Sequence, residues 1–219
     1  MKKLIVIFGI GALIAILIYK ITVINKIDVL VVGDSVATGD TLYGNSGVSF
    51  NLFLKDYLKD KRLRHYNINY TQNNKTLKDF YYELNQNEEI NEKHIQNLVK
   101  DSDIIIIALG QDELVNNSNI NNLKNINRKN FYQDYQKVLI KIREITQNPI
   151  YLVGYYGDTI NQLNEIEKSI KVIAQNQNCQ YISISNLITT DDYVDSTFIH
   201  LNHKGHRKIF EQIKKELAL

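Results

Sequence analysis

Residues 29–39 read Val29–Leu30–Val31–Val32–Gly33–Asp34–Ser35–Val36–Ala37–Thr38–Gly39, an aliphatic run that ends abruptly in Gly-Asp-Ser. Such an uninterrupted run predicts a strand that is buried on both faces, as in a parallel sheet covered by helices. Gly33 allows a sharp turn at the carboxyl end of this strand, which is the edge where ligands bind in open α/β sheets. We therefore expect Ser35 to be held there as an accessible nucleophile. The alternative is an ordinary strand end, in which Asp34 and Ser35 form a turn or cap a helix.

Apolar runs and stretches with helical spacing alternate along the rest of the chain. This order predicts an α/β domain with about five parallel strands, right-handed crossovers and helices on both faces of the sheet. Strands are expected at 28–32, 65–70, 104–110, 150–153 and 181–184. Helices are expected to start at Ser49 or Asn51 and to cover 76–84, 90–100, 131–145 and 161–174, with a last helix capped by Asn202. Residues 40–49 and 116–130 are expected to form surface loops.

Composition is that of a globular protein of ordinary size. The 219 residues suit one domain at 26–219 with a short appendage, and a net charge of +2 with scattered lysines does not favour nucleic acid as a partner. Cys179 is the only cysteine, which excludes an intrachain disulfide and fits no metal motif. We expect it to be a buried structural thiol before a strand.

The first 25 residues form a separate segment with the composition of a membrane anchor. Lys2 and Lys3 precede an apolar stretch from residue 4 to residue 24, in which Lys20 is the only charged residue. This length spans a hydrocarbon core of about 30 Å at about 1.5 Å per residue. The two lysines favour a cytoplasmic start, which predicts a single-pass cell-membrane protein with residues 26–219 on the extracytoplasmic side. A cleaved signal peptide is the competing interpretation, although no small-residue cleavage site follows the apolar run.

A histidine near the end of the chain is a candidate partner for Ser35. His200 lies immediately before the segment that starts the last helix. Serine is a weak nucleophile and a neutral imidazole can take its proton, so these two residues are the pair that acyl chemistry needs. The spacing of His200, His203 and His206 also suggests a metal site, but no carboxylate or cysteine completes the set. Residues 33–39 have neither the glycine fingerprint of dinucleotide sites nor the lysine of a phosphate loop.

The Gly-Asp-Ser motif at 33–35, followed distantly by His200, Asn202 and Gly205, resembles the SGNH (GDSL-type) hydrolase family. The resemblance covers most of the chain after the anchor. It implies a three-layer α/β/α, flavodoxin-like fold and ester hydrolysis or acyl transfer without a metal or an organic cofactor. By position in the motifs, Ser35 would be the nucleophile, its backbone N–H would contribute to the oxyanion hole, and His200 would be the general base.

Three family positions carry unusual residues here. A glycine that supplies a second oxyanion N–H corresponds to Asn74, and asparagine tolerates a left-handed backbone conformation. The family asparagine that donates to the oxyanion corresponds to Asp112, whose ionised carboxylate cannot donate and would oppose the oxyanion charge; Gln111 is the alternative donor. The family aspartate before the histidine corresponds to Thr197, a weaker acceptor, with Asp195 as the first alternative acid and Asp192 as the second.

Together these residues predict a membrane-anchored serine esterase or acylhydrolase. Its expected substrate is a small-molecule, glycan or lipid ester, and the expected location favours an acylated cell-envelope glycan or lipid. Two alternatives stay open. One is an O-acyltransferase, which differs only in the group that accepts the acyl unit, and the other is a domain that keeps the fold but binds without catalysis. Asp112 and Thr197 favour the binding domain.

Overall fold

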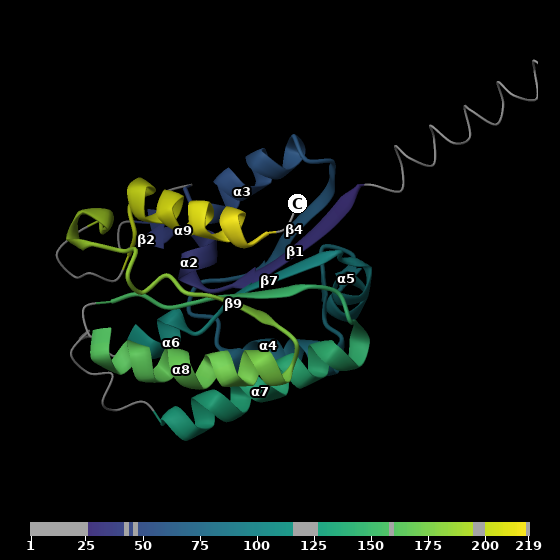
Figure 1. Ribbon diagram of the computed structural model, residues 1–219. Helices are drawn as coiled ribbons and strands as arrows, with labels where there is room; N and C mark the ends of the chain where they lie inside the picture. Colours follow the sequence, from purple (N-terminus) through teal and green to yellow (C-terminus); the bar gives the residue numbers. More distant parts are fainter. Residues whose placement is uncertain are drawn as a thin grey trace, which may run out of the picture.

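Five parallel strands form the central sheet of the computed structural model, in the order β4–β1–β7–β8–β9 (Figure 1). In this order the first sheet strand along the chain lies between the second and the third, which is the flavodoxin-like arrangement. The sheet confirms the predicted α/β class and its five parallel strands. The strands are β1 (Ile27–Gly33), β4 (Leu63–Thr71), β7 (Ile104–Ala108), β8 (Ile150–Val153) and β9 (Gln180–Ile182).

The structure describes residues 26–41, 44–45, 48–115, 127–157, 160–194 and 200–217. The predicted membrane anchor at residues 1–25 lies outside these ranges, as do Asp195 and Thr197. Among the described residues, no helix combines the length and the apolar character that a membrane crossing requires.

Helices cover both faces of the sheet and complete three layers (Figure 1). One face carries α2 (Ser35–Thr38), α3 (Phe50–Lys59) and α9 (His203–Glu216). The other carries α4 (Leu77–Gln86), α5 (Ile95–Asp101), α6 (Gln111–Val115), α7 (Arg128–Ile145) and α8 (Ile160–Asn176). Three helix starts confirm the sequence prediction, because Ser49, Thr76 and Asn202 each cap a helix with a side-chain oxygen.

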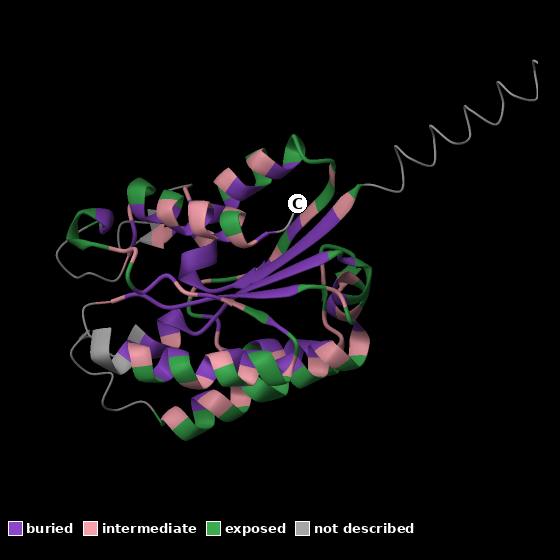
Figure 2. Ribbon diagram, viewed as in Figure 1, coloured by how far each residue is buried: buried purple, intermediate pink, exposed green. Residues whose placement is uncertain are grey.

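The three central strands, β1, β7 and β8, are buried between the helical layers because their side chains are mostly apolar on both faces (Figure 2). In β1, Leu30 and Val32 pack with residues of α4, α5, α7 and α8, whereas Val29 and Val31 pack with residues of α3 and α9. All four side chains are at most 1% exposed. Burial on both faces holds β1 in the middle of the molecule, and it therefore fixes the position of Ser35, which follows the strand.

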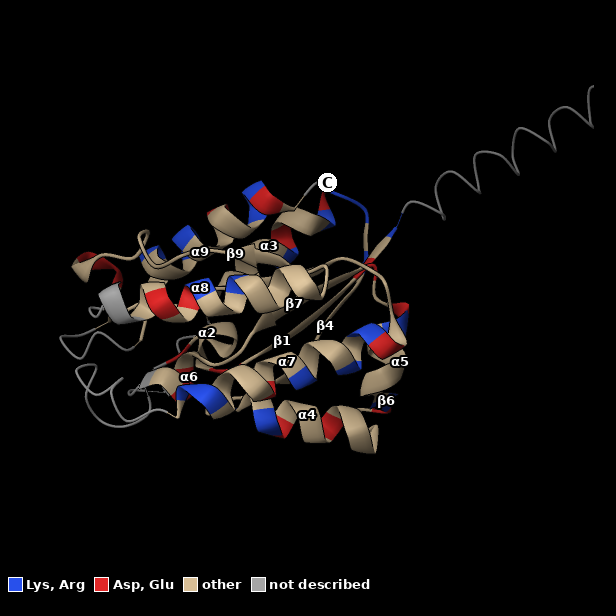
Figure 3. Ribbon diagram, turned by 60° about the horizontal axis from the view of Figure 1, so that its bottom comes forward, with Lys and Arg blue, Asp and Glu red and all other residues tan. Residues whose placement is uncertain are grey.

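The outer faces of the helices carry interspersed charges of both signs (Figure 3). Some of these charges form ion pairs within one helical turn, such as Lys137 with Asp134 and Lys141 with Glu144 on α7. Exposed pairs of this kind add little to the free energy of unfolding. The stability of the fold therefore depends on the buried layers.

The predicted start of the helix expected at 90–100 was wrong. It begins only at Ile95, because β5 (Glu89–Ile90) and β6 (Lys93–His94) form a short antiparallel hairpin before it. Asn91 and Glu92 make the turn of this hairpin with φ angles of 52° and 61°. A right-handed helix cannot include positive φ angles, so the helix starts after the hairpin.

Two expected loops also differ in part from the structure. The segment 40–49 contains a small antiparallel hairpin of β2 (Asp40–Thr41) and β3 (Gly44–Asn45). Within 116–130, residues 116–126 lie outside the described ranges, and α7 begins at Arg128 with Asn127 as its cap. Before α9, a short 3-10 helix covers Thr190–Asp192.

Candidate active site

The carboxyl ends of β1, β4 and β7 bring three predicted site residues together at one edge of the sheet. Ser35 is the first residue of α2 and follows β1 after Asp34. Asn74 lies in the turn between β4 and α4, and Asp112 lies in the first turn of α6, after β7. Because β1 lies between β4 and β7, its end is the point where the connections leave in opposite directions, and ligands bind at such points in open α/β sheets.

The Asp112 carboxylate joins these residues through three hydrogen bonds. Its Oδ2 atom accepts from the backbone N–H of Ser35 at 3.0 Å and from the backbone N–H of Asn74 at 2.9 Å. Its Oδ1 atom accepts from the Ser35 hydroxyl. One carboxylate oxygen therefore lies where two backbone donors converge, beside the hydroxyl of the candidate nucleophile.

Asp34 is a second buried carboxylate at this edge, and it stabilises the local backbone. Its Oδ1 atom accepts from Val36 N–H at 3.1 Å and so caps α2, and its Oδ2 atom accepts from Asp112 N–H at 3.2 Å. Burial, and then the charge of Asp112, raise the pKa of Asp34 well above its ordinary value, although hydrogen bonds from backbone N–H groups oppose this rise. The neutral form of Asp34 is therefore favoured. The interpretation of Asp34 as a helix cap is confirmed.

Two glycines allow the strands to turn sharply into the site. A Cβ atom on Gly33 would lie 2.3 Å from Ala37 Cβ and 2.9 Å from the carbonyl oxygen of Ala108, so no larger residue fits between α2 and β7. Gly110 turns the chain from β7 into α6 with a φ of 103°, which other residues rarely adopt. These turns set the positions of α2 and α6, the two short helices that carry Ser35 and Asp112.

The turn that carries Asn74 is bound to the end of β1. Gln72 N–H donates to the carbonyl oxygen of Gly33 at 3.0 Å, and Lys75 N–H closes the turn on the carbonyl oxygen of Gln72 at 3.2 Å. Asn74 itself has a φ of 57°, the left-handed conformation that its residue type was expected to tolerate. The N–H of Asn74 is therefore directed at Asp112 by a hydrogen-bonded turn.

A buried ion pair follows Asn74 in the chain. Lys75 Nζ lies 2.5 Å and 2.7 Å from the two carboxylate oxygens of Glu83, and the two side chains are 2% and 11% exposed. The same Nζ lies 5.6 Å from the centre of the Tyr70 ring. Burial raises the pKa of Glu83, although Lys75 opposes the rise. The pair joins the Asn74 turn to the middle of α4, and neither charge has much contact with solvent.

Glu113, the residue after Asp112, binds the start of α4. Its Oε2 atom accepts from the N–H of Leu77, the first residue of that helix, at 2.9 Å. Burial raises the pKa of Glu113 to about 7, and the hydrogen bond from Leu77 opposes the rise. Neighbouring carboxylates on one short helix therefore have different partners, because Asp112 contacts Ser35 and Glu113 contacts α4.

Gln111 joins the start of α6 to the end of β8. Its side-chain amide donates to the carbonyl oxygen of Tyr156 at 2.9 Å and accepts from Tyr156 N–H at 3.1 Å. Tyr156 packs against Tyr193 with 5.9 Å between ring centres, and Tyr193 pairs with Leu201, the residue after His200. This series of contacts joins the segment that carries His200 to the sheet edge that carries Ser35.

The three histidines near the end of the chain lie in different surroundings. His200 is half-buried, and its carbonyl oxygen accepts from Val194 N–H at 2.9 Å. His203 is exposed and packs its ring against Phe53, with 5.0 Å between ring centres. His206 is buried, and burial lowers its pKa to about 4. No group of three or more His, Cys, Asp or Glu side chains in the described ranges is placed to hold a metal ion.

Ser35 was expected to be accessible, but it is buried, with 8% of the residue exposed. Its hydroxyl forms a hydrogen bond with a carboxylate in this structure and not with a histidine. Its partner is Asp112, and no hydrogen bond between described atoms joins it to His200. The pairing of Ser35 with His200 therefore stays a prediction. The supporting roles of Thr197 and Asp195 also stay predictions, because both residues lie outside the described ranges.

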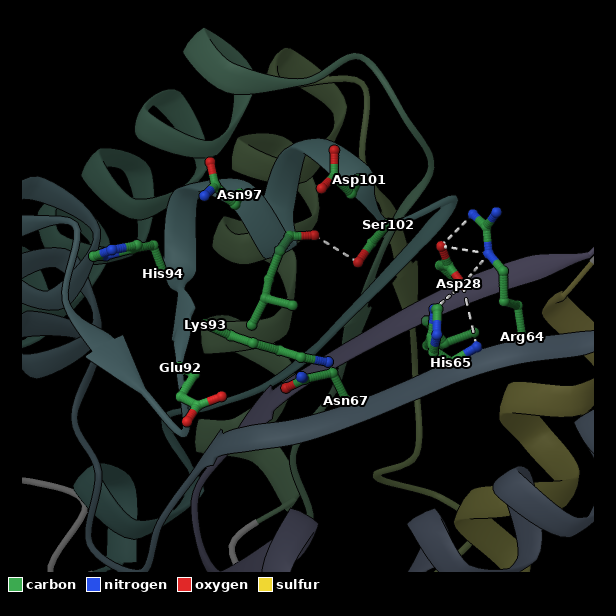
Figure 4. Close-up of a pocket in the computed structure, with 12 residues that line it drawn as sticks. Asp28, Arg64, His65, Asn67, Glu92, Lys93, His94, Asn97, Asp101 and Ser102 are labelled. Atoms are coloured by element: carbon green, nitrogen blue, oxygen red, sulfur yellow. Dashed lines mark hydrogen bonds and ion pairs between the residues drawn. The ribbon is translucent and has the colours of Figure 1, made fainter.

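A pocket of about 530 Å³ lies at the opposite, amino edge of the sheet (Figure 4). Asp28 of β1 lies in its wall, and its carboxylate accepts from the Arg64 guanidinium at 2.9 Å and from His65 N–H at 3.1 Å. Although burial alone would raise it, the pKa of Asp28 is lowered, chiefly by the hydrogen bonds and charge of Arg64. These charged groups bind one another and join β1 to β4.

Comparisons with known proteins bear on the family and the fold of this chain. A family model described as “GDSL-like Lipase/Acylhydrolase” matches residues 29–213. A comparison with curated proteins gave no match. Three solved structures are similar in fold, and their low sequence identities limit that likeness to the fold. TesA is 14% identical with a TM-score of 0.67, and the match covers 87% of this chain and 98% of TesA. A lipase/acylhydrolase from Enterococcus faecalis is 18% identical with a TM-score of 0.65, and the match covers 88% of this chain and 95% of that one. A catalytic mutant of the acetylxylan esterase Axe2 from Geobacillus stearothermophilus is 12% identical with a TM-score of 0.66, and the match covers 88% of this chain and 94% of that one.

Replacing Lys75 with methionine is expected to lower the free energy of unfolding by about 3–5 kcal/mol, because Glu83 then remains buried without its partner. The double replacement Lys75→Met/Glu83→Leu removes both charges and is expected to recover most of this loss. Urea unfolding of the wild type and both variants measures the difference. A double variant as unstable as the single one would contradict the role assigned to the ion pair.

Glu113 is expected to make the domain less stable as the pH rises from about 4.5 to about 7. Its pKa is about 7 in the folded chain against an ordinary 4.5, so the folded state binds this proton more tightly and loses that advantage as the proton leaves. Relative to Glu113→Gln, which keeps an acceptor for Leu77 N–H, the wild type should lose on the order of 2 kcal/mol across this range.

Unfolding free energies measured in steps between about pH 4 and pH 8 test this expectation. Glu144→Gln serves as the matched control, because that carboxylate is exposed and its loss should leave the pH profile unchanged. A constant difference between the wild type and Glu113→Gln at every pH would show that Glu113 does not titrate as expected.

Proposed function

Because the chain belongs to the GDSL-like lipase/acylhydrolase family, we propose that it is a serine esterase in which Ser35 attacks an ester carbonyl and His200 moves the proton. The family match spans residues 29–213 and so includes both residues. The proposed oxyanion hole consists of the backbone N–H groups of Ser35 and Asn74. The proposal involves no metal and no organic cofactor.

Convergence of two backbone donors on one oxygen atom is the observation that carries this proposal. The N–H groups of Ser35 and Asn74 contact Asp112 Oδ2 at 3.0 Å and 2.9 Å. An oxyanion is stabilised by donors that lie about 2.7–3.1 Å from the position it will occupy. In this proposal the carboxylate oxygen marks the position that the carbonyl oxygen of a bound ester takes, next to the Ser35 hydroxyl.

The reaction proceeds through an acyl group on Ser35. Ser35 Oγ bonds to the carbonyl carbon while His200 takes the hydroxyl proton, and the negative charge moves to the carbonyl oxygen. The N–H groups of Ser35 and Asn74 stabilise that charge. The intermediate then expels the alcohol, which receives the proton from His200. Water attacks the acyl group in the second half-reaction, His200 takes its proton and returns it to Ser35, and the carboxylic acid leaves.

The place of His200 in the fold supports its role as the base. Its segment is joined to the edge that carries Ser35 through the pairing of Leu201 with Tyr193 and the packing of Tyr193 on Tyr156. Its half-buried position keeps it accessible to the water that the second half-reaction consumes. A neutral imidazole is the usual base for a serine hydroxyl near neutral pH.

The first 25 residues support a location at the outer surface of the cell membrane, through the apolar run between residues 4 and 24. β1 begins at Ile27, directly after this segment, and Ser35 lies beyond its other end. The seven residues of β1, at about 3.3 Å each, separate the start of this strand from the site by roughly 20 Å. The expected location favours an acylated cell-envelope glycan or lipid as the substrate.

Asp112 favours a second candidate function, which is binding without catalysis. Its carboxylate occupies the point where the donors converge and cannot itself donate a hydrogen bond when ionised. A domain of this kind would hold Ser35 unreactive, whereas an esterase requires Ser35 to react. The reactivity of Ser35 therefore distinguishes the two functions.

A fluorophosphonate probe is expected to modify Ser35, because the probe reacts with activated serine nucleophiles. Ser35→Ala should abolish the adduct and the hydrolysis of p-nitrophenyl acetate, and His200→Ala should slow hydrolysis by about 10²–10⁴-fold. Intact-mass spectrometry locates the adduct, and absorbance follows hydrolysis. Ser169→Ala and His203→Gln are the matched controls, since Ser169 is half-buried on α8, His203 is exposed, and both lie outside the proposed machinery. Activity retained by Ser35→Ala would contradict the esterase function.

The full-length chain is expected to remain with the membrane fraction at high salt and to dissolve only in detergent, because the apolar run between residues 4 and 24 is long enough to cross a membrane. Protease added to intact cells stripped of their wall should digest residues 26–219 if that part lies outside. The intact mass of the extracted protein should include residues 1–25. A shortened protein in the soluble fraction would instead show that the segment is a cleaved signal peptide.

A further inference from the structure

The Asp112 carboxylate and the oxyanion of the proposed reaction require the same position. We propose that Asp112 closes the resting site, so that an ester reacts with Ser35 only after its carbonyl oxygen has displaced the Asp112 carboxylate. This inference rests on the esterase function proposed above and adds a control element to that site. It assigns Asp112 a role opposite to that of the asparagine found at the corresponding family position.

Competition for donors is the first argument. The N–H groups of Ser35 and Asn74 already contact Asp112 Oδ2 at 3.0 Å and 2.9 Å. Each N–H carries a single hydrogen, so neither can bind a substrate oxygen at full strength while the carboxylate remains. The Ser35 hydroxyl is engaged by the other carboxylate oxygen. A single side chain therefore occupies the nucleophile and both donors of the oxyanion hole.

Charge is the second argument. A carboxylate beside a developing oxyanion disfavours it, because like charges at short distance repel strongly in a buried site. Asp112 is only 8% exposed, so little water is available to screen its charge. No cation contacts the Asp112 carboxylate in the part of the chain that the structure describes. The reaction therefore needs Asp112 to leave the position that the oxyanion will take.

A role for Asp112 as the base that activates Ser35 does not fit the same contacts. The hydroxyl does donate to Asp112 Oδ1, as it would to a base. However, Oδ2 of the same carboxylate fills the oxyanion hole in this position, so the group that would take the proton also excludes the carbonyl oxygen. The geometry therefore favours a blocking role over a catalytic one.

Rotation of the Asp112 side chain is sufficient to open the site. The residue before it, Gln111, binds the backbone of Tyr156 in both directions, and the residue after it, Glu113, binds Leu77 N–H. Both contacts hold the backbone of α6 on either side of Asp112. Displacement by a substrate therefore changes a side-chain torsion and leaves the helix in place.

Asparagine at position 112 is expected to open the site. An amide has the shape of the carboxylate but no charge, so its oxygen accepts more weakly from the two N–H groups, and its NH₂ group cannot accept from the Ser35 hydroxyl as Asp112 Oδ1 does. Its NH₂ group can instead donate to the oxyanion. Alanine at this position removes both the charge and the contacts.

The test compares the rate at which a fluorophosphonate modifies Ser35 in the full-length wild type, Asp112→Asn and Asp112→Ala. We expect at least tenfold faster modification of Asp112→Asn and a lower KM for p-nitrophenyl acetate, because a larger fraction of molecules is open to substrate. Asp112→Ala should also react faster than the wild type. Glu144→Gln is the matched control, since it makes the same carboxylate-to-amide change at an exposed residue of α7 outside the proposed site, and it should react like the wild type.

The outcomes separate this inference from the esterase function. Rates for Asp112→Asn and Asp112→Ala that equal or fall below the wild-type rate, with Ser35 still modified, would overturn the blocking role and leave the esterase function standing. Absence of modification in all the folded proteins would overturn both. Circular dichroism identifies a variant that does not fold, and the remaining variant at position 112 then decides the question.

Discussion

Parallel pairing of β1 with β4 on one side and with β7 on the other brings the ends of three strands level with one another. Gly33 of β1 lies opposite Thr71 of β4 and opposite Ala108 of β7, so the segments that follow these strands emerge side by side. The backbone N–H groups of Ser35 and Asn74, which precede Asp112 by 77 and 38 residues, can then donate to one of its carboxylate oxygens. A change in the register of either pair would separate these groups, so the site exists only while the central sheet keeps this register.

Carboxylates are concentrated around this edge, and each is stabilised by a different neighbour. Burying a charge is costly unless it is paired or neutralised. Burial favours the neutral form of Asp34, Glu83 binds Lys75, and Glu113 binds the start of α4. Asp112 relies on the same N–H groups that the proposed reaction needs. The burial and hydrogen bonds that make this edge costly to fold thus also determine the chemical properties of its carboxylates, as is typical of functional sites.

Local sequence patterns predicted the fold well because helix caps and apolar runs act over a few residues. Ser49 was predicted as a helix cap from its own segment, and the left-handed conformation of Asn74 follows from its residue type. The hairpin before α5 was missed because its turn includes Glu92, which has no preference for a positive φ. The sequence motifs identified Asp112 as a member of the site, but its contacts depend on the register of three strands, and no local pattern contains that register.

β4 lies at one edge of the sheet in the described part of the chain, so the outer side of its backbone is not paired within this sheet. Exposed strand edges readily pair with strands of other molecules and so promote aggregation. The amino end of β4 carries Arg64 and His65, whose side chains are 46% and 65% exposed, and Asp28 binds both. A strand that added to this edge would have to remove water from these charges. The ion pair between β1 and β4 therefore also opposes the addition of a further strand to the sheet, at the end of β1 opposite Ser35.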